Sequence, residues 1–546
     1  MAEAYSRGAD DAPLLEETIG ANLDRTVAEH GERDALISCQ QDLHYTWSEL
    51  VAEVDRVARG LIAAGLRQGD RVGIWSPNCA EWTLVQYATA RLGVILVNIN
   101  PAYRTSELEY AVRQSGCRML IAAPAFKTSD YRGMVAEVRD RLPALEQVVF
   151  LEGEDWDALL AGGESVDPAQ VGERQATLTP QDPINIQYTS GTTGYPKGAT
   201  LTHRNILNNG FFVGEGVRYT AEDRVCIPVP FYHCFGMVMG NLACSSHGAA
   251  MVIPAPAFEP EATLEAVAGT RCTSLYGVPT MFIAELDHPR FDEFDLTSLR
   301  TGIMAGSPCP VEVMKRVIDR MHMSEVGICY GMTETSPVST QTAVDDPIAK
   351  RVGTVGRVGQ HLEVKVADPE SGETVQRGEP GELCTRGYSV MTGYWEDPER
   401  TDEAIDVDHW MHTGDLATMD DDGYLNIVGR IKDLVIRGGE NVYPREVEEF
   451  LYTHPEIADV QVIGVPDERY GEELMAWIIP RGRTELTEAG VREYCQGKIA
   501  HYKVPRYVKF VDAFPMTVTG KVQKFKMRET AVQELDLGVA ASAETA

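Results

Sequence analysis

Helical and strand-like patterns of apolar residues alternate along the first part of the chain. The segment that starts at Thr46 opens with TWSE, a capping-box pattern, and its apolar positions follow helical spacing to about Gly65. The apolar run RVGIWS follows, then a second helical pattern through Gln86 and the run VILVNIN. This alternation predicts a mostly parallel sheet with helices on both faces.

The pattern changes twice further along the chain. Buried-strand runs continue through CTSLYGV, but beyond Val352 short strands alternate with Gly, Pro and Asp turns, which predicts a β-rich subdomain. Beyond Lys432 the segments outline a compact α+β unit of about a hundred residues, enough for a domain. We therefore expect an α/β protein with an N-terminal domain over 1–431, a small α+β C-terminal domain over 432–535 and a flexible tail over 536–546.

Composition and charge exclude several classes of function. The 546 residues are 44% hydrophobic and carry a formal net charge of −33, which argues against nucleic-acid binding and against docking on an anionic membrane. The uncharged segment from Cys234 to Phe258 contains Asn241, His247 and two prolines, so it predicts a buried helix and strand, not a membrane span. Eleven cysteines without a C-x-x-C pair and a start without a signal pattern predict a cytoplasmic protein.

Positive charge is concentrated near the C-terminus. Between Val491 and Thr530 there are nine Lys or Arg residues and three acids. Either this stretch forms a solvated charged face or it meets an acidic ligand, and the sequence leaves both open.

The stretch YTSGTTGYPKG, from Tyr188 to Gly198, has the composition of a phosphate-binding loop. Its glycines allow close approach of backbone N–H groups, its hydroxyls add hydrogen bonds, and Lys197 adds a positive charge. A Walker A loop is excluded because Pro196 and Gly198 occupy positions that need Gly and Ser or Thr. The strand-like INIQYTS before it and an N-cap at Thr202 after it predict that the loop joins a strand to a helix.

Four further stretches carry chemical side chains in tight turns. YGMTETSP offers an aromatic ring, a hydroxyl and a carboxylate, which suit a base, a phosphate and Mg²⁺. HTGDL supplies Asp415, and GRIKDLVIRGGENVYP supplies Arg430 and Lys432, a pattern suited to a ribose diol. TGKVQK places Lys521 behind a glycine. Taken singly, these residues are equally typical of helix caps, turn acids and surface ion pairs.

In this order YTSGTTGYPKG, PFYHCFG, YGMTETSP, HTGDL, GRIKDLVIRGGENVYP and TGKVQK resemble the signature motifs of the adenylate-forming (AMP-binding) superfamily. The resemblance covers nearly the whole chain. It implies a ligase that makes acyl-AMP and pyrophosphate from ATP and a carboxylic acid, and then a thioester and AMP. It also implies that the C-terminal domain rotates between the two half-reactions.

The resemblance assigns roles to residues of this chain. It implies phosphate contacts in the loop from Thr189 to Lys197, adenine stacking on Tyr330 and Mg²⁺ held by Glu334. Asp415 and Arg430 would bind ribose. The catalytic set it implies is Lys521, Thr333, Glu334 and His233. The residues it implies for ATP and CoA are Thr189, Ser190, Gly191, Thr192, Thr193, Gly194, Lys197, Gly306, Ser307, Tyr330, Gly331, Asp415, Arg430, the hinge Lys432, Gly438 and Gly439.

The acid and the acceptor are inferred from departures within these motifs. PFYHCFG offers His233 and no aspartate, so an amino-acid substrate would leave its ammonium group unpaired. Acetate-specific relatives carry tryptophan where Gly331 stands, so we expect an open acyl tunnel with an apolar wall for a medium- or long-chain acid. CoA is the expected acceptor because the Gly438-Gly439 loop resembles a pantetheine channel and the basic stretch suits the CoA phosphates.

The alternatives are an aryl-acid CoA ligase, a fatty acyl-AMP ligase that loads a carrier protein, and a non-catalytic binding protein of the same fold. The sequence leaves the oligomeric state open between monomer and homodimer.

Overall fold

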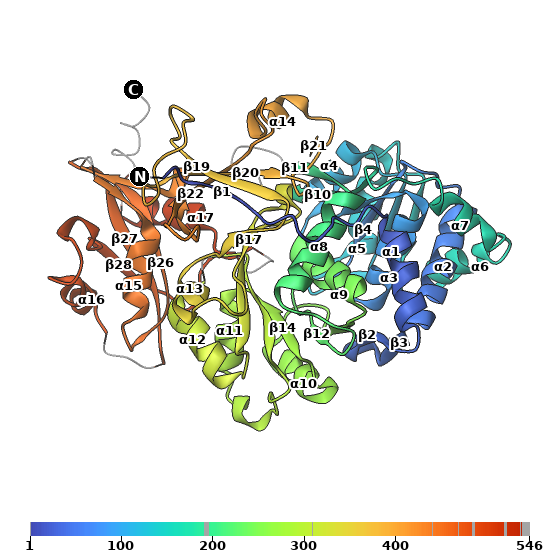
Figure 1. Ribbon diagram of the computed structural model, residues 1–546, viewed down its shortest axis with the longest axis horizontal. Helices are drawn as coiled ribbons and strands as arrows, with labels where there is room; N and C mark the ends of the chain where they lie inside the picture. Colours follow the sequence, from blue (N-terminus) through green and yellow to red (C-terminus); the bar gives the residue numbers. More distant parts are fainter. Residues whose placement is uncertain are drawn as a thin grey trace.

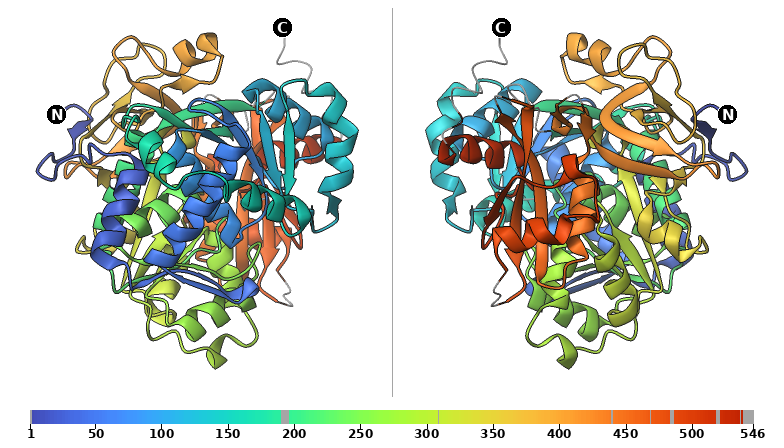
Figure 2. Two further views of the ribbon diagram at one scale, coloured as in Figure 1. Left: turned by 90° about the vertical axis from the view of Figure 1, so that its right-hand side faces the viewer. Right: turned by 90° about the vertical axis from the view of Figure 1, so that its left-hand side faces the viewer.

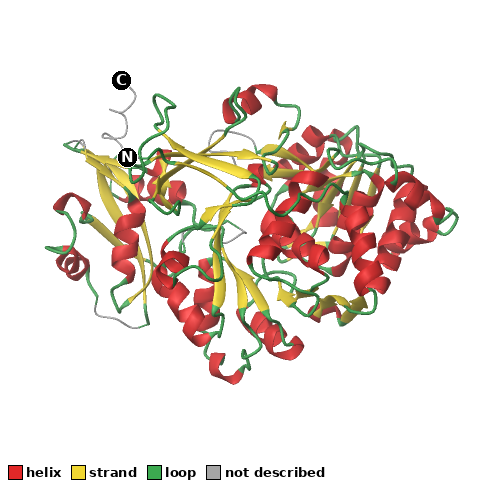
Figure 3. Ribbon diagram, viewed as in Figure 1, coloured by secondary structure: helices red, strands yellow, loops and turns green. Residues whose placement is uncertain are grey.

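The protein is described here from a computed structural model, with helices and strands coloured in Figure 3. The described residues are 2–189, 196–307, 309–438, 440–467, 469–482, 486–517, 521–535 and 537.

A seven-stranded sheet forms one side of the N-terminal part. Its strand order is β21-β11-β10-β5-β4-β6-β9, and the strands from β10 to β9 are parallel. The strands are β4 (Arg71–Trp75), β5 (Ile95–Asn98), β6 (Met119–Ala122), β9 (Gln147–Phe150), β10 (Pro183–Thr189), β11 (Lys197–Thr202) and β21 (Gly393–Tyr394). The helices of this region, on the right in Figure 1, are α1 (Ile19–His30), α2 (Trp47–Ala63), α3 (Ala80–Leu92), α4 (Thr105–Ser115), α5 (Tyr131–Val138), α6 (Glu154–Gly163) and α7 (Ala169–Gln175).

A nine-stranded sheet follows the order β18-β17-β16-β15-β14-β12-β13-β2-β3 and is parallel from β16 to β2. Its strands are β2 (Asp34–Ser38), β3 (Leu43–Thr46), β12 (Arg224–Cys226), β13 (Ala250–Ile253), β14 (Ser274–Gly277), β15 (Thr301–Met304), β16 (Glu325–Gly331), β17 (Val338–Gln341) and β18 (Arg357–Val358). The next helices along the chain are α8 (His203–Gly216), α9 (Ala243–His247), α10 (Pro260–Thr270), α11 (Pro279–Leu286), α12 (Val311–Arg320) and α13 (Ile348–Gly353). The largest apolar cluster joins the two sheets, through Leu96 of β5, Met251 of β13 and Trp82 of α3.

The predicted β-rich subdomain is an antiparallel sheet of order β1-β19-β20-β22-β23. Its strands are β1 (Tyr5–Arg7), β19 (Leu362–Ala367), β20 (Gly381–Gly387), β22 (Met411–Met419) and β23 (Leu425–Arg430), and α14 (Pro398–Ala404) lies in the connection before β22. The sequence pattern missed β1 because this strand is only three residues long. It joins the sheet from the other end of the chain.

The strands change sheet between Arg430 and Val435. The C-terminal sheet has the order β25-β24-β27-β26, with β28 beside β27, and it faces the viewer in the right-hand view of Figure 2. Its strands are β24 (Val435–Arg437), β25 (Glu440–Val442), β26 (Ile457–Asp467), β27 (Gly471–Pro480) and β28 (Tyr507–Phe510), with helices α15 (Pro444–Tyr452), α16 (Glu488–Cys495) and α17 (Lys524–Glu534). The α/β class is confirmed, while the boundary at Lys432 stays a prediction.

Local signals in the sequence had mixed outcomes. Thr46 caps α2 with the expected capping box, and Thr202 caps α8. The prediction that the phosphate loop joins a strand to a helix is wrong, because β11 intervenes: Thr189 and Lys197 are antiparallel partners in a β10–β11 hairpin. The short alternating run KGATLT carries this strand.

The uncharged segment after Cys234 is buried, as expected. It forms a π-helix (Phe235–Leu242), then α9 and β13. Within the described ranges, no helix combines the length and the apolar character needed to cross a membrane.

The C-terminal unit contacts α12 through one acidic side chain. Helix α12 starts after Pro310 without a side-chain cap of its own. The Glu449 carboxylate, from α15, accepts a hydrogen bond from the backbone N–H of Val311, while burial raises the pKa of Glu449. Glu449 therefore supplies, from another part of the chain, an acceptor that the start of a helix needs.

Gly331 lies where two strands of the nine-stranded sheet come very close. The β16–β17 register shifts between Tyr330 and Gly331. A Cβ atom at 331 would lie 1.7 Å from the carbonyl oxygen of Pro337. A side chain at this position would therefore force the β16–β17 backbone of this chain to shift, and Gly331 is not independent support for an open acyl tunnel.

We expect Gly331→Ala to lower the free energy of unfolding by about 1–3 kcal/mol, because the new methyl group forces the backbone apart. Urea and thermal unfolding measure this loss. Gly172→Ala is the matched control, since a Cβ at this position in α7 meets no atom within 4 Å. An unfolding midpoint for Gly331→Ala equal to that of the control would contradict the close approach.

Candidate active site

Asp415 and Arg430 face each other across an antiparallel strand pair. They are direct register partners on β22 and β23, and Arg430 Nε lies 2.9 Å from Asp415 Oδ1. The Tyr330 hydroxyl, at the end of β16, donates to Asp415 Oδ2 at 2.7 Å. Burial and then the Asp415 charge raise the pKa of Tyr330, so its phenol stays protonated. These contacts join the end of the nine-stranded sheet to the β-rich subdomain.

Glu334 is a buried carboxylate in the turn after β16. Its Oε1 accepts hydrogen bonds from the Thr189 hydroxyl at 3.2 Å and from the Tyr394 hydroxyl at 2.9 Å. In the described part of the chain no Lys, Arg or His nitrogen lies within 4.0 Å of this carboxylate. Lys197 lies instead over the Tyr394 ring, with its Nζ 4.7 Å from the ring centroid. A buried carboxylate without a cationic partner is suited to hold a bound cation.

Four cations converge near these two carboxylates. Burial lowers the pKa of Lys432, and the charges of Arg430 and Lys197 lower it further. Burial also lowers the pKa of Lys521, again with a contribution from Arg430. Each ammonium group therefore lies within electrostatic reach of another cation, an arrangement that a polyanion such as a triphosphate would stabilise.

Lys521 is presented by a hairpin of the C-terminal unit. Its backbone N–H donates to the Thr517 hydroxyl at 3.0 Å, and its carbonyl accepts from the Thr517 N–H at 2.7 Å. A Cβ at Gly306 would lie 4.0 Å from Lys521 Cε, so the lysine stem passes directly over the end of β15. No carboxylate oxygen lies within 4.0 Å of its ammonium group among the described residues.

His233 lies beside this lysine as a neutral imidazole. Burial lowers its pKa to about 3, and the Lys521 charge acts in the same direction. Its Nδ1 accepts from the Phe235 N–H at 3.3 Å, so the ring is fixed at the start of the π-helix. Behind it lies the largest apolar cluster, which includes much of the expected acyl lining: Phe235, Met237, Val238, Tyr276, Val278, Met281, Ile303 and Ala305.

The structure brings most of the predicted site residues together. Those linked by the contacts above are Thr189, Lys197, His233, Gly306, Tyr330, Glu334, Asp415, Arg430, Lys432 and Lys521. Thr333 and Gly331 lie in the same turn as Glu334, and Ser307 follows Gly306. Ser190, Gly191, Thr192, Thr193, Gly194 and Gly439 lie outside the described residues. Gly438 contacts Tyr470 of the C-terminal unit, and its predicted role toward CoA stays a prediction.

The C-terminal basic stretch is largely neutralised by its own domain, which favours the solvated charged face of the two interpretations that the sequence left open. Six of its nine cations lie within 4.0 Å of a carboxylate, so few charges remain for an acidic ligand. These six are Arg492, Lys503, Arg506, Lys509, Lys524 and Arg528.

Two groups of residues were missed by the sequence reasoning. Tyr394 touches both Glu334 and Lys197, but a tyrosine in GYWEDPE carries no chemical signal of its own. Glu382, Cys384 and His412 form a polar cluster beside the Asp415 turn. The histidine of HTGDL was the available signal, but its partners come from another strand.

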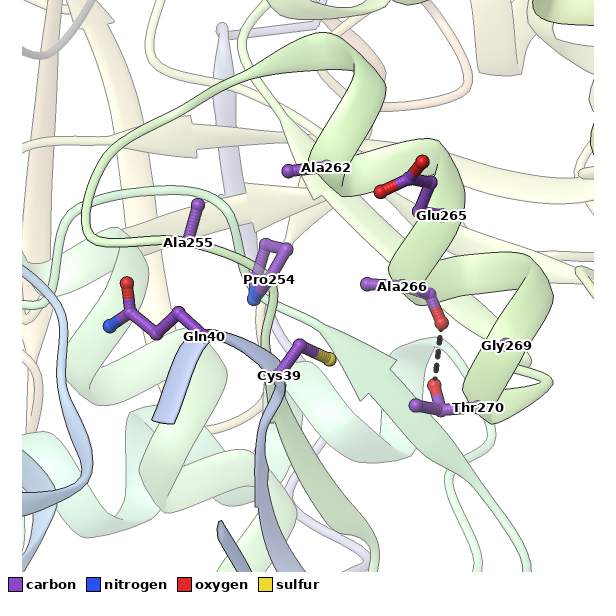
Figure 4. Close-up of a pocket in the computed structure, with 9 residues that line it drawn as sticks. All are labelled: Cys39, Gln40, Pro254, Ala255, Ala262, Glu265, Ala266, Gly269 and Thr270. Atoms are coloured by element: carbon purple, nitrogen blue, oxygen red, sulfur yellow. Dashed lines mark hydrogen bonds between the residues drawn. The ribbon is translucent and has the colours of Figure 1, made fainter. Parts of the chain in front are cut away.

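A separate hollow of about 420 Å³ lies at the ends of β2 and β13 against α10 (Figure 4). Its lining includes Cys39, Gln40 and Glu265, and none of the predicted site residues. It is therefore distinct from the site at Asp415 and Lys521.

Comparison with known proteins gives concordant matches. A family model described as AMP-binding enzyme matches residues 23–395, and one described as AMP-binding enzyme C-terminal domain matches residues 446–521. A Bacillus subtilis protein named acyl-CoA synthetase YngI is 47% identical over 545 residues, which cover 96% of this chain and 99% of the relative. The mitochondrial medium-chain acyl-CoA ligase ACSF2 of Rattus norvegicus is 43% identical over 557 residues, which cover 98% of this chain and 91% of the relative.

The fold is shared with solved structures. ATP-bound MatB from Rhodopseudomonas palustris has a TM-score of 0.84 at 30% identity, covering 95% of this chain and 99% of that chain. The family model spans more than half of the sequence, and the two relatives match nearly all of it. The chain therefore belongs to the AMP-binding enzyme family and is an adenylate-forming acyl-CoA synthetase, which uses ATP to join a carboxylic acid to CoA.

Proposed function

We propose that this enzyme activates medium-chain aliphatic acids. The observation that carries the aliphatic assignment is the position of Lys521, which lies at the boundary between the cation cluster and the apolar cluster behind His233. The medium chain length is supported by the name of the relative ACSF2, a medium-chain acyl-CoA ligase. A fatty acid placed with its carboxylate at Lys521 would have its chain among apolar side chains and its reacting oxygen near the nucleotide. Each buried methylene contributes about 0.8 kcal/mol to binding.

The nucleotide occupies the polar side of this boundary in the proposal. Asp415 accepts hydrogen bonds from the ribose hydroxyls, Arg430 braces the sugar, and the Tyr330 ring supports adenine. The loop from Thr189 to Lys197 holds the terminal phosphates, and Thr333 contacts the α-phosphate. Lys521 stabilises the charge that develops on the α-phosphate as the substrate carboxylate attacks it. No side-chain nucleophile is needed, since the substrate carboxylate is itself the nucleophile.

Mg²⁺ fits the proposal at Glu334. A buried carboxylate with two hydroxyl donors and no cationic partner within 4.0 Å, among the residues described, is a hard-oxygen site that favours a divalent cation. When bound, Mg²⁺ neutralises phosphate charge and polarises the phosphoryl oxygens. Glu334 would hold the ion, and Thr189 and Tyr394 would orient the carboxylate.

In this proposal the thioester step requires a different orientation of the C-terminal unit relative to the N-terminal part. Lys521 and Gly438 belong to the same unit, and here Lys521 is the one that contacts the site. Rotation near Lys432 would withdraw Lys521 and bring the Gly438-Gly439 loop toward the acyl adenylate for CoA to enter. The neutralised basic stretch leaves this loop as the better-supported route for CoA.

The proposal also covers the cellular location and the oligomeric state of the enzyme. ACSF2 is named a mitochondrial protein, whereas YngI comes from a bacterium, and we propose a cytoplasmic location for this chain. The proposal accommodates either a monomer or a homodimer.

The substrate class is tested by AMP formation, with and without CoA, across straight-chain acids of four to eighteen carbons, acetate, benzoate and coumarate. We expect kcat/KM to peak at a medium chain and to fall steeply for acetate, because short acids lose apolar contacts. Preference for an aryl acid would overturn the aliphatic assignment. Acyl-AMP release that CoA does not accelerate would indicate a carrier protein as acceptor.

Lys521→Ala is expected to slow acyl-AMP formation by about 100-fold or more, because it removes a charge that acts on the transition state. Thiolysis of supplied acyl-AMP should fall less than about tenfold, since that step is proposed to proceed with Lys521 withdrawn. Single-turnover assays of the two half-reactions separate these effects. Lys526→Ala, an exposed lysine on α17, is the matched control. Equal loss in both half-reactions would reject this role.

A further inference from the structure

The strand that carries Asp415 has a bulge at that residue. In the β20–β22 pair, Glu382 faces Leu416 whereas Cys384 faces His412, so Thr413, Gly414 and Asp415 of β22 lie opposite Leu383 alone. The bulge contains Gly414 in a left-handed conformation, with φ of 69°. Bulges change the direction in which a strand presents its side chains. The last side chain of this bulge is Asp415.

Glu382 holds this bulge from the neighbouring strand. Its Oε1 accepts from the backbone N–H of Gly414 at 2.9 Å, and its Oε2 lies 2.8 Å from His412 Nδ1. Thr413 completes the turn, because its hydroxyl donates to the Leu383 carbonyl at 2.6 Å and accepts from the Asp415 N–H at 3.1 Å. One carboxylate therefore joins His412, just before the bulge, to Gly414 in the middle of it.

His412 faces acids on both sides of its ring. Besides Glu382 at Nδ1, the Asp406 carboxylate lies 3.5 Å from Nε2, and the Cys384 thiol lies 3.6 Å from Nδ1. The hydrogen bonds with Cys384 and Glu382 raise the pKa of His412 to about 10.

The same atoms have the composition of a metal site, but their arrangement favours an imidazolium ion. A metal ligand needs an unprotonated ring nitrogen, whereas each nitrogen of His412 faces a carboxylate: Glu382 is hydrogen-bonded to Nδ1, and Asp406 lies 3.5 Å from Nε2. Glu382 also already accepts from Gly414, so its carboxylate is committed to the bulge.

We propose that Glu382 and His412 are positioning residues for the nucleotide: they hold the β22 bulge so that Asp415 points at the ribose hydroxyls. This rests on the proposed role of Asp415 in nucleotide binding. The His412 imidazolium orients the Glu382 carboxylate, Glu382 fixes the Gly414 N–H, and the turn then delivers Asp415 to Tyr330 and Arg430. The pair touches neither substrate in this arrangement, so its effect falls on ATP affinity.

The test compares three variants in the adenylation half-reaction. His412→Gln removes the positive charge, and we expect it to raise KM for ATP about tenfold or more, since it weakens charged hydrogen bonds. KM for the carboxylic acid should change less than about twofold. His412→Arg, which restores a cation with several donors, should return KM for ATP to within about threefold of wild type. His409→Asn is the control, because His409 is exposed in the preceding loop.

The pH dependence gives a readout that a merely structural role would not move. A raised pKa means that the contribution of protonated His412 is present below its unfolded value and lost only as pH rises through about 10. The ratio of KM for ATP between wild type and His412→Arg should therefore stay constant from pH 6 to 9. If this KM ratio instead changes with pH, with a midpoint between pH 6 and 7, the assignment of His412 as an imidazolium ion is wrong.

Two further results separate failure of this inference from failure of the proposed function. If Asp415→Ala leaves KM for ATP unchanged, the role of Asp415 itself is wrong. If Asp415→Ala raises KM and His412→Gln does not, the positioning pair is wrong. In the Asp415→Ala background, His412→Gln should add no further loss, because the two changes act through one contact. Metal analysis gives a last check. If wild type binds one zinc ion per chain and His412→Gln binds none, the cluster is a metal site and the positioning pair is wrong.

Discussion

The pairing of Asp415 with Arg430 across β22 and β23 is the constraint on which the site depends. Register fixes the two side chains opposite each other, and Tyr330 joins them from another sheet. A one-residue slip in either strand would send Asp415 to the other face of the sheet. The bulge in which Thr413, Gly414 and Asp415 lie opposite Leu383 therefore has a functional consequence, since Asp415 itself belongs to it.

A local positive site is built within a strongly acidic chain. Most cations of the C-terminal stretch are neutralised by carboxylates of their own unit, whereas Lys521 is left without an acid within 4.0 Å among the described residues. Three further positive charges lie in the same region: those of Lys197, Arg430 and Lys432. The net charge of −33 thus says little about the ligand, because the local arrangement determines which ions bind.

Much of the fold followed from the sequence, and the ordered motifs named most of the residues that the structure brings together in the candidate site. Capping signals placed α2 and α8, and ordered motifs identified Asp415, Arg430 and Lys521 with the family. Three things did not follow. Strand β11 was too rich in small and polar residues to be distinguished from a loop. Glycine at 331 was read as space for a substrate, whereas a backbone contact explains it. Glu382 lies thirty residues before His412, and only strand pairing brings them together.

The burial of Lys521 links ligand binding to the position of the C-terminal unit. Burying an ammonium group beside Arg430 without a close acid is unfavourable, and the lowered pKa of Lys521 expresses this cost. A bound phosphate or carboxylate would remove this cost and would stabilise the arrangement with Lys521 in place. In the proposed reaction cycle, fewer negative charges would oppose withdrawal of Lys521 once pyrophosphate has left, so the chemistry itself would bias the position of the C-terminal unit.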